Sequence, residues 1–142
     1  MQAHDISIHA FDNGAHRQQV IELWQAVFDY PADYNDPAFV IDRKIVADGL
    51  FFVAVDRDTV VGTVMAGYDG HRGWIYSLAV HPKQRQQGVG SMLLAFAEQS
   101  LVRLGCFKVN LQILETNEAV RKFYEANGFA VEARLSMGKR LG

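Results

Sequence analysis

The chain has 142 residues, of which 49% are apolar, a length and composition typical of one globular domain with its own core. Its 14 Lys and Arg residues nearly balance its 16 Asp and Glu residues without clusters of like charge, so neither nucleic acid nor an anionic membrane is expected as a partner. No secretory signal pattern and no apolar run of roughly 18 residues is present, and the single cysteine fits a reducing compartment, so we expect a cytoplasmic protein.

One strand and two helices are expected in the first third of the chain. Residues 6–11 alternate apolar and polar side chains, as a half-buried strand does. Apolar side chains then recur at three- and four-residue spacing over residues 15–30, which predicts a helix that ends at Pro31. Asp36 and Pro37 supply an N-cap and a first-turn proline for a second helix, whose apolar side is expected to consist of Phe39, Val40, Ile45 and Val46.

Three antiparallel strands are expected next. Residues 50–55 and 59–66 are rich in β-branched side chains and flank a short polar turn, a pattern that favours a hairpin. The glycine-rich turn 67–73 then leads into a third apolar segment, residues 74–80.

A helix over residues 88–104, with Gly105 as its stop, separates this third strand from a strand over 107–114. Such a unit implies local parallel pairing with a right-handed crossover. Asn117 caps a last helix, and residues 129–141 are expected to form one or two closing strands.

The loop before the helix over 88–104 contains Arg85-x-x-Gly88-x-Gly90. Glycines at a helix start allow a ligand to approach the first N–H groups closely, and those groups form an anion site with the helix dipole. A Walker loop would need lysine in place of Ser91, and a dinucleotide fingerprint would need glycine in place of Leu93, so both motifs are excluded. A tight turn into a core helix is the alternative interpretation.

Arg85 to Gly90 resembles the acetyl-CoA-binding motif, Arg/Gln-x-x-Gly-x-Gly/Ala, of the GNAT N-acetyltransferase superfamily. About thirty residues further on, a second signature of that family is matched by Asn117, Ala119, Phe123, Tyr124, Gly128 and Phe129. Within the family, residues 67–73 and 135–141 are similar to the short bacterial YpeA-type acetyltransferases.

This resemblance implies an α+β fold in a single domain over residues 1–142. The fold would have a central, mostly antiparallel sheet of six to seven strands, four helices and a splayed parallel strand pair. Many relatives form dimers, so a homodimer is a further expectation.

Acetyl-CoA is the implied cosubstrate, and no metal is expected, because the five histidines show no metal-ligand spacing. By resemblance, the pantetheine arm pairs with the backbone of Leu78, Ala79 and Val80. The pyrophosphate is held by the turn made of Arg85, Gln86, Gln87, Gly88, Val89, Gly90 and Ser91. Asn117 and Tyr124 complete the implied cofactor contacts. Gln86 and Gln87 depart from the usual glycine and basic residue, but both retain the backbone N–H donor.

The implied reaction is transfer of the acetyl group to a primary amine. The amine, with a pKa of about 10, must lose its proton; a backbone N–H near Leu78 to Val80 would stabilise the oxyanion. Tyr124 matches the family's general acid. Many relatives place the general base where Tyr76 stands here, so Asp69, His71 and a water chain are the candidates; an exposed turn is the simpler account of Asp69 and His71.

The acceptor is expected to be a small-molecule amine or a peptide or protein amine, bound by Tyr30, Asp33, Tyr34, Asp36 and Tyr76. Carboxylates and aromatic faces favour a cationic amine, although a solvated loop would look the same. A non-catalytic acyl-CoA-binding or sensing module is the alternative function, and nucleotide binding unrelated to coenzyme A is disfavoured by the two excluded motifs.

Overall fold

The structure is a computed structural model that describes residues 5–28 and 33–142. The chain divides into two compact units, Met1–Leu111 and Gln112–Gly142, and each is described by itself. The first contains a five-stranded sheet with three helices, and the second contains one helix and an extended C-terminal segment.

The sheet of the first unit has its strands in sequence order, β1-β2-β3-β4-β5. The first four strands pair antiparallel, and β5 is parallel to β4. Their bounds are Ile6–Ala10 (β1), Phe51–Asp56 (β2), Thr59–Tyr68 (β3), Gly73–Val80 (β4) and Val109–Leu111 (β5). The expected hairpin and the parallel unit after it are both present, and β5 is shorter than residues 107–114.

The expected count of six to seven strands is wrong for the described residues, because residues 129–142 contain no strand. Their alternating apolar side chains are not buried: Leu135 is 91% exposed and Met137 is 90% exposed. A strand is stable only when a partner satisfies its backbone and one face is covered. The alternating pattern of residues 129–142 therefore indicated a propensity for strand, but no neighbouring strand among the described residues pairs with this segment.

The four expected helices are present. They are α1 (Asn13–Val27), α2 (Pro37–Ala47), α3 (Val89–Arg103) and α4 (Glu118–Ala126), with short 3-10 turns η2 (Asp33–Asn35) and η3 (Pro82–Gln84). Asp36 caps α2 as expected, since its Oδ2 accepts a hydrogen bond from the Phe39 N–H at 3.3 Å. α1 ends at Val27, before the expected end at Pro31.

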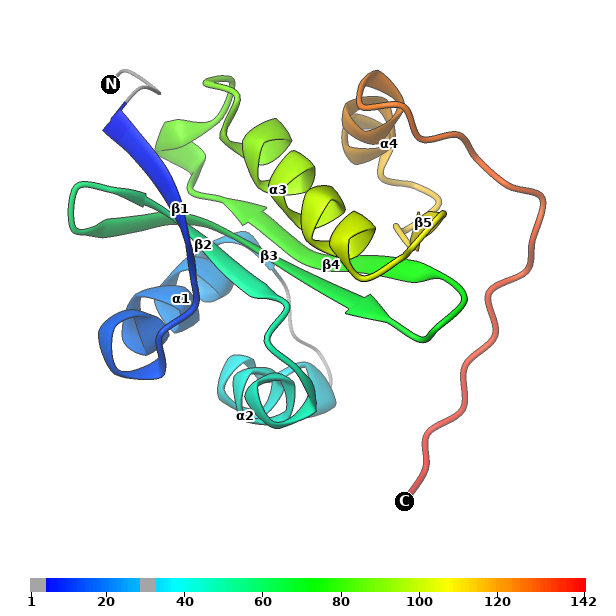
Figure 1. Ribbon diagram of the computed structural model, residues 1–142, viewed down its shortest axis with the longest axis horizontal. Coiled ribbons are helices and arrows are strands. Elements are labelled where there is room, and N and C mark those ends of the chain that lie inside the picture. The colour runs from blue at the N-terminus through cyan, green and yellow to red at the C-terminus, as the bar shows by residue number, and fades with distance from the viewer. Residues whose placement is uncertain (1–4, 29–32) are drawn as a thin grey trace. The chain divides into compact units, whose positions relative to one another are not determined.

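Helices cover both faces of the sheet in the first unit: α1 and α2 lie on one face and α3 on the other (Figure 1). The core beneath α1 and α2 includes the fully buried Trp24, Ile41 and Met65. α3 buries Leu93, Leu94 and Leu101 against the opposite face. This arrangement of one mixed sheet and four helices confirms the expected α+β class.

The apolar side expected for α2 is wrong at three of its four residues, since only Val40 packs, partly buried, against the core. Phe39 and Ile45 are about half exposed and Val46 is 86% exposed, whereas the buried positions are Pro37, Ile41 and Lys44. These three are spaced i, i+4 and i+7, as one helix face requires. A lysine on the buried face therefore misled a prediction based on hydropathy.

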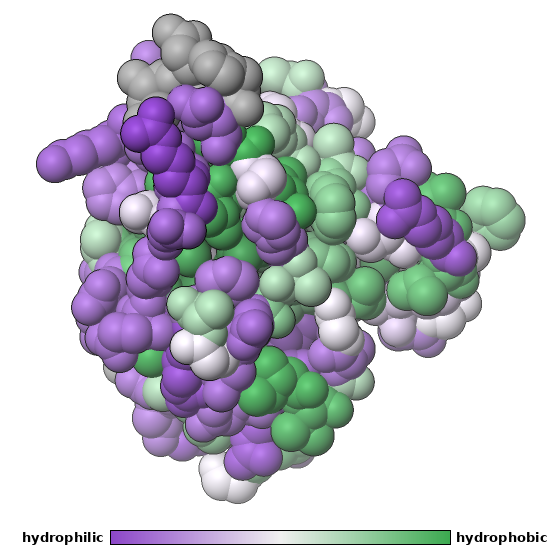
Figure 2. Space-filling model, turned by 60° about the vertical axis from the view of Figure 1, so that its left-hand side comes forward, coloured by the Kyte–Doolittle hydropathy of each residue, from purple (hydrophilic) through white to green (hydrophobic). Residues whose placement is uncertain are grey.

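No helix in the described part of the chain is both long enough and apolar enough to span a bilayer. The face of the molecule in Figure 2 shows hydrophilic residues interspersed with hydrophobic ones.

Candidate active site

The glycine turn lies between β4 and α3. His81 starts the 3-10 turn η3, where its Nδ1 accepts a hydrogen bond from the Lys83 N–H at 3.1 Å. The chain then passes through Gln86 and Gly88, which have φ angles of 65° and 81°, before α3 begins at Val89. Left-handed backbone at Gly88 explains the glycine, because other residues rarely adopt this conformation.

The start of α3 is open. No side chain caps its first N–H groups, and a Cβ placed on Gly88 would meet no atom within 4 Å. The first N–H groups of a helix have no partner within the helix. With the positive end of the helix dipole, these donors can bind an anion such as a phosphate group.

A β-bulge distorts β4 one residue after Tyr76. Tyr76 pairs with Met65 and Ala79 with Thr63, so Ser77 and Leu78 stand opposite the single residue Val64. Ser77 adopts a φ of 53°, a conformation that costs a non-glycine residue about 1–2 kcal/mol. Strain of this kind persists only where surrounding contacts hold it.

β4 and β5 pair only at their first residues. The parallel register joins Gly73 to Val109, Trp74 to Asn110 and Ile75 to Leu111. Among the described residues, β4 continues from Tyr76 to Val80 without a strand partner on that side. The splayed pair expected from the resemblance is therefore present, and it leaves the backbone of Leu78 to Val80 at an open edge that leads into the glycine turn.

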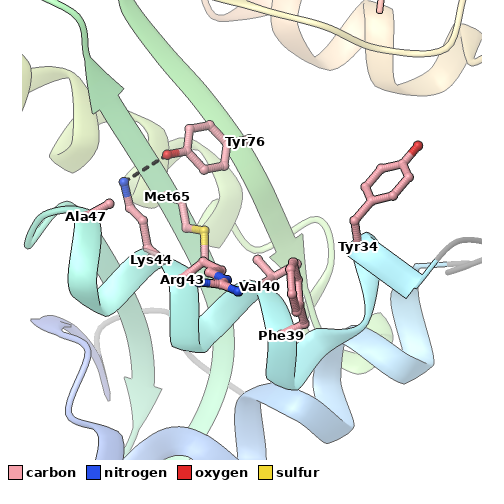
Figure 3. Close-up of a pocket in the computed structure, with 8 residues that line it drawn as sticks. All are labelled: Tyr34, Phe39, Val40, Arg43, Lys44, Ala47, Met65 and Tyr76. Carbon is pink, nitrogen blue, oxygen red and sulfur yellow. Dashed lines mark hydrogen bonds between the residues drawn. The ribbon is translucent and has the colours of Figure 1, made fainter. Parts of the chain in front are cut away.

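A pocket of about 280 Å³ lies beside β4. Its lining is mainly apolar and comes from α2, from β3 and β4, and from η2 (Figure 3). The lining residues are Tyr34, Phe39, Val40, Arg43, Lys44, Ala47, Met65 and Tyr76.

Lys44 holds Tyr76 at one side of this pocket. Only 5% of Lys44 is exposed, and its Nζ lies 2.8 Å from the Tyr76 hydroxyl and 2.7 Å from Asp48 Oδ1. The same ammonium group donates to the Ala66 carbonyl, so its three donors each have an acceptor. Figure 3 shows the two side chains pointing toward each other. Lys44 is therefore a buried anchor for Tyr76.

The structure places two of the five expected acceptor-binding residues, Tyr34 and Tyr76, at the pocket. Asp36 is occupied as the N-cap of α2, Asp33 begins η2, and Tyr30 lies outside the described residues. Sequence reasoning missed the cations of the pocket, Arg43 and Lys44. Lys44 stands four residues before Asp48 and on the same helix face as Ile41, but neither spacing indicates that the lysine is buried.

Asp69 and His71 lie in the turn between β3 and β4. Asp69 Oδ1 accepts hydrogen bonds from the N–H groups of His71 and Arg72, both at 2.8 Å. These bonds, that from Arg72 first, lower the pKa of Asp69 and make it a weaker base. From Gly73 to Leu78 the strand rises roughly 16 Å, so neither side chain reaches an amine at the bulge directly.

Tyr124 and Asn117 belong to the second unit. Asn117 Oδ1 accepts from the Val120 N–H at 3.2 Å and caps α4. Tyr124 is 9% exposed and packs edge to face against Phe123 and Phe129, with ring centroids 5.1 and 5.5 Å away. Burial raises the pKa of Tyr124 to about 12, so its hydroxyl keeps its proton at neutral pH.

The model of the acetyltransferase (GNAT) family matches residues 17–129, which include strands β2 to β5, the glycine turn and α4. The chain belongs to the GNAT family. Both signatures identified in the sequence fall within the matched range.

Solved GNAT structures share the fold. The PaiA N-acetyltransferase from Thermoplasma acidophilum in complex with coenzyme A superposes with a TM-score of 0.78 at 19% identity, over 91% of this chain and 92% of that chain. The NatC complex bound to Gag peptide and CoA superposes with a TM-score of 0.80 at 24% identity, over 95% of this chain and 89% of that chain. AAC(6')-Iy in complex with the bisubstrate analog CoA-S-monomethyl-acetylneamine superposes with a TM-score of 0.76 at 20% identity, over 96% of this chain and 99% of that chain.

Proposed function

We propose that the protein is an acetyl-CoA-dependent N-acetyltransferase that moves the acetyl group to a primary amine by direct attack in a ternary complex. The observation that carries the proposal is the open edge of β4, residues 76–80, which runs into the uncapped start of α3. An extended amide chain that ends in a pyrophosphate fits such a site, because the edge offers a ladder of backbone groups and the helix offers N–H donors. Coenzyme A has this chemistry.

The cofactor contacts proposed here are mainly backbone contacts. Leu78, Ala79 and Val80 would pair with the pantetheine arm, and the turn from Arg85 to Ser91 would hold the pyrophosphate. Lys83 and Arg85 are the nearest cations in the sequence for an outer phosphate. A site built from N–H groups tolerates Gln86 and Gln87, since their side chains are not needed for binding.

The chemistry needs an amine without its proton, a donor for the oxyanion and a proton for the departing thiolate. A backbone N–H at the β4 bulge supplies the donor for the oxyanion. The family resemblance assigns the proton for the departing thiolate to Tyr124, whose hydroxyl is protonated at neutral pH, as a general acid must be. Because Asp69 and His71 lie at the far end of β4, a water chain is the route we propose for the amine proton.

The pocket beside Tyr76 is the proposed acceptor site. Its lining offers aromatic and aliphatic surface with the Arg43 guanidinium 5.0 Å from the Phe39 ring centroid. This favours an amine with an apolar body and a carboxylate or other anion, whereas the acidic and aromatic loop favoured a cationic amine. Solved GNAT structures carry both a peptide and an aminoglycoside-like bisubstrate, so peptide and small-molecule acceptors both belong in the test.

The test is release of CoA from acetyl-CoA with amines offered in matched pairs, one with a carboxylate and one without, and with short peptides. Wild type runs beside Tyr124→Phe, which removes the proposed acid, and Gly88→Trp, which fills the open space before α3. Turnover that falls at least about tenfold in both variants supports the proposal. Arg43→Ala is expected to reduce the preference for the carboxylate-bearing partner of each pair.

The competing function is an acyl-CoA-binding module without catalysis. It predicts that acetyl-CoA raises the melting temperature of wild type but not of Gly88→Trp, while no amine is acetylated. Absence of both turnover and thermal shift in wild type would refute the cofactor assignment itself.

A further inference from the structure

A buried chain of hydrogen bonds leads from α1 through β3 to the bulge in β4. The Trp24 indole N–H donates to Thr63 Oγ1 at 2.8 Å, and the Thr63 hydroxyl donates to the Ser77 carbonyl at 2.9 Å. Trp24 and Thr63 are both fully buried, with 0% of each exposed. The Thr63 hydroxyl therefore lies in an apolar core and has two hydrogen-bond partners, the Trp24 indole and the Ser77 carbonyl.

The direction of these bonds is determined by the donors that each group has. An indole N–H can only donate, so the Thr63 oxygen must accept from Trp24. The single hydroxyl proton of Thr63 is then used for the Ser77 carbonyl. At the bulge, where Ser77 has left the regular strand conformation, a side chain thus holds this carbonyl in place.

Fixing the Ser77 carbonyl also fixes the next N–H. The described peptide bonds are trans, and in a planar trans peptide the N–H of one residue points opposite to the C=O of the residue before it. The Leu78 N–H is therefore directed away from Thr63. Thr63 belongs to β3, and on the other side of β4 the pairing with β5 ends at Ile75, so a donor directed away from Thr63 has room to meet a ligand there.

We propose that Thr63 is a positioning residue for acetyl transfer: its hydroxyl holds the Ser77–Leu78 peptide so that the Leu78 N–H meets the carbonyl oxygen of the acetyl group. This inference rests on the proposed function. The amine nitrogen forms a bond to the acetyl carbon while the C=O π electrons move to oxygen, where the Leu78 N–H stabilises the charge. The oxyanion then collapses, the C–S bond breaks, and one proton lost by the amine is balanced by one gained at the CoA sulfur.

The first test separates the acetyl carbonyl from the rest of the cofactor. Calorimetry gives the dissociation constants of acetyl-CoA and of S-ethyl-CoA, a thioether that lacks the carbonyl oxygen. Wild type is expected to prefer acetyl-CoA by roughly three- to tenfold, the range for one hydrogen bond. Thr63→Val, which keeps the shape and removes the hydroxyl, should lose this preference while its affinity for S-ethyl-CoA stays within about twofold.

Two variants distinguish positioning from lost stability. Thr63→Ser keeps the hydroxyl and should retain the preference. Trp24→Phe removes the indole donor from the core but leaves the Thr63 to Ser77 bond, so it should retain the preference even at a lower melting temperature. If Thr63→Val does not fold, Thr63→Cys takes its place, because a thiol is only a weak donor to the Ser77 carbonyl.

With an amine that wild type acetylates, Thr63→Val should lower kcat about tenfold or more, because the oxyanion carries more charge than the ground-state carbonyl. The KM for acetyl-CoA should rise by no more than the roughly three- to tenfold loss of affinity expected from calorimetry. An unchanged preference and kcat in Thr63→Val, or equal losses in Trp24→Phe, would overturn the inference alone. If wild type binds neither ligand, the proposed function fails and the inference fails with it. Binding of both ligands without turnover still leaves the affinity ratio to decide the role of Thr63.

Discussion

Tyr124 holds its proton more tightly than a tyrosine in water does, because its burial disfavours the charged phenolate and raises its pKa to about 12. At neutral pH the residue can donate a proton and cannot act as a base. The general acid proposed from the family resemblance needs a protonated hydroxyl, which an ordinary tyrosine also has at neutral pH, and the raised pKa makes Tyr124 a weaker acid. It also links the stability of the protein to pH in a way that can be measured without an acceptor.

The stability of wild type should fall more steeply above pH 10 than that of Tyr124→Phe. Between the unfolded pKa of about 10 and the folded pKa of about 12, the unfolded chain releases the Tyr124 proton and the folded chain keeps it, so rising pH favours unfolding. The extra loss in wild type should total on the order of 2–3 kcal/mol by pH 12. Urea unfolding of both proteins from pH 8 to pH 12 measures it, and parallel curves would contradict the burial of this hydroxyl.

Individual residues also show what the sequence could and could not reveal about the site. Gly88 and Asn117 were predictable, because their roles depend on local backbone geometry and on short spacing. The bulge at Ser77 was not, since it results from a register shift between two strands. Lys44 was missed because its burial depends on partners brought by the strands: the Tyr76 hydroxyl and the Ala66 carbonyl.

Between elements, a glycine allows α3 to pack closely on the sheet. A Cβ on Gly62 of β3 would lie 2.8 Å from Leu93 Cδ1 and 3.0 Å from the Ala79 carbonyl oxygen. Leu93 is fully buried and the carbonyl belongs to a paired strand, so neither neighbour can move freely. Gly62 is therefore required because there is no space for a Cβ, whereas Gly88 is required because its backbone is left-handed.

Gly62→Ala should therefore lower the free energy of unfolding by about 1–3 kcal/mol, the usual range for overpacking a core. Gly49→Ala is the matched control, because a Cβ there meets nothing within 4 Å and its φ is not left-handed. The control should stay within about 0.5 kcal/mol of wild type. Chemical unfolding of the three proteins gives the values; equal stabilities would mean that α3 and β3 are less closely packed than described.

The order of elements was largely predictable from the sequence, because caps, turns and apolar periods are local. The paired strands of the first unit follow that prediction up to β5. The closing strands do not, since strand formation in residues 129–141 depends on a partner edge that periodicity cannot supply. Alternation there records only which side chains would share a face.

Across the whole molecule, burial is distributed unequally along the chain, and hydrogen exchange should follow it. All six residues of β2 are buried, whereas every residue from Val131 to Gly142 is exposed. Amides in a buried ladder exchange only when the structure opens, and exposed amides without partners exchange at nearly the rate of a free peptide.

Mass spectrometry should therefore find that peptides from β2 and β3 exchange at least about a thousandfold more slowly than the same peptides in denaturant, as expected for a domain stable by 5 kcal/mol or more. Peptides from residues 131–142 should exchange at nearly the same rate in both conditions. Strong protection of that segment would show that it pairs as a strand in solution, as its alternating sequence suggests, and would contradict an unpaired C-terminal segment. Comparing each peptide with its own denatured rate removes differences in intrinsic exchange, so the contrast reports structure alone.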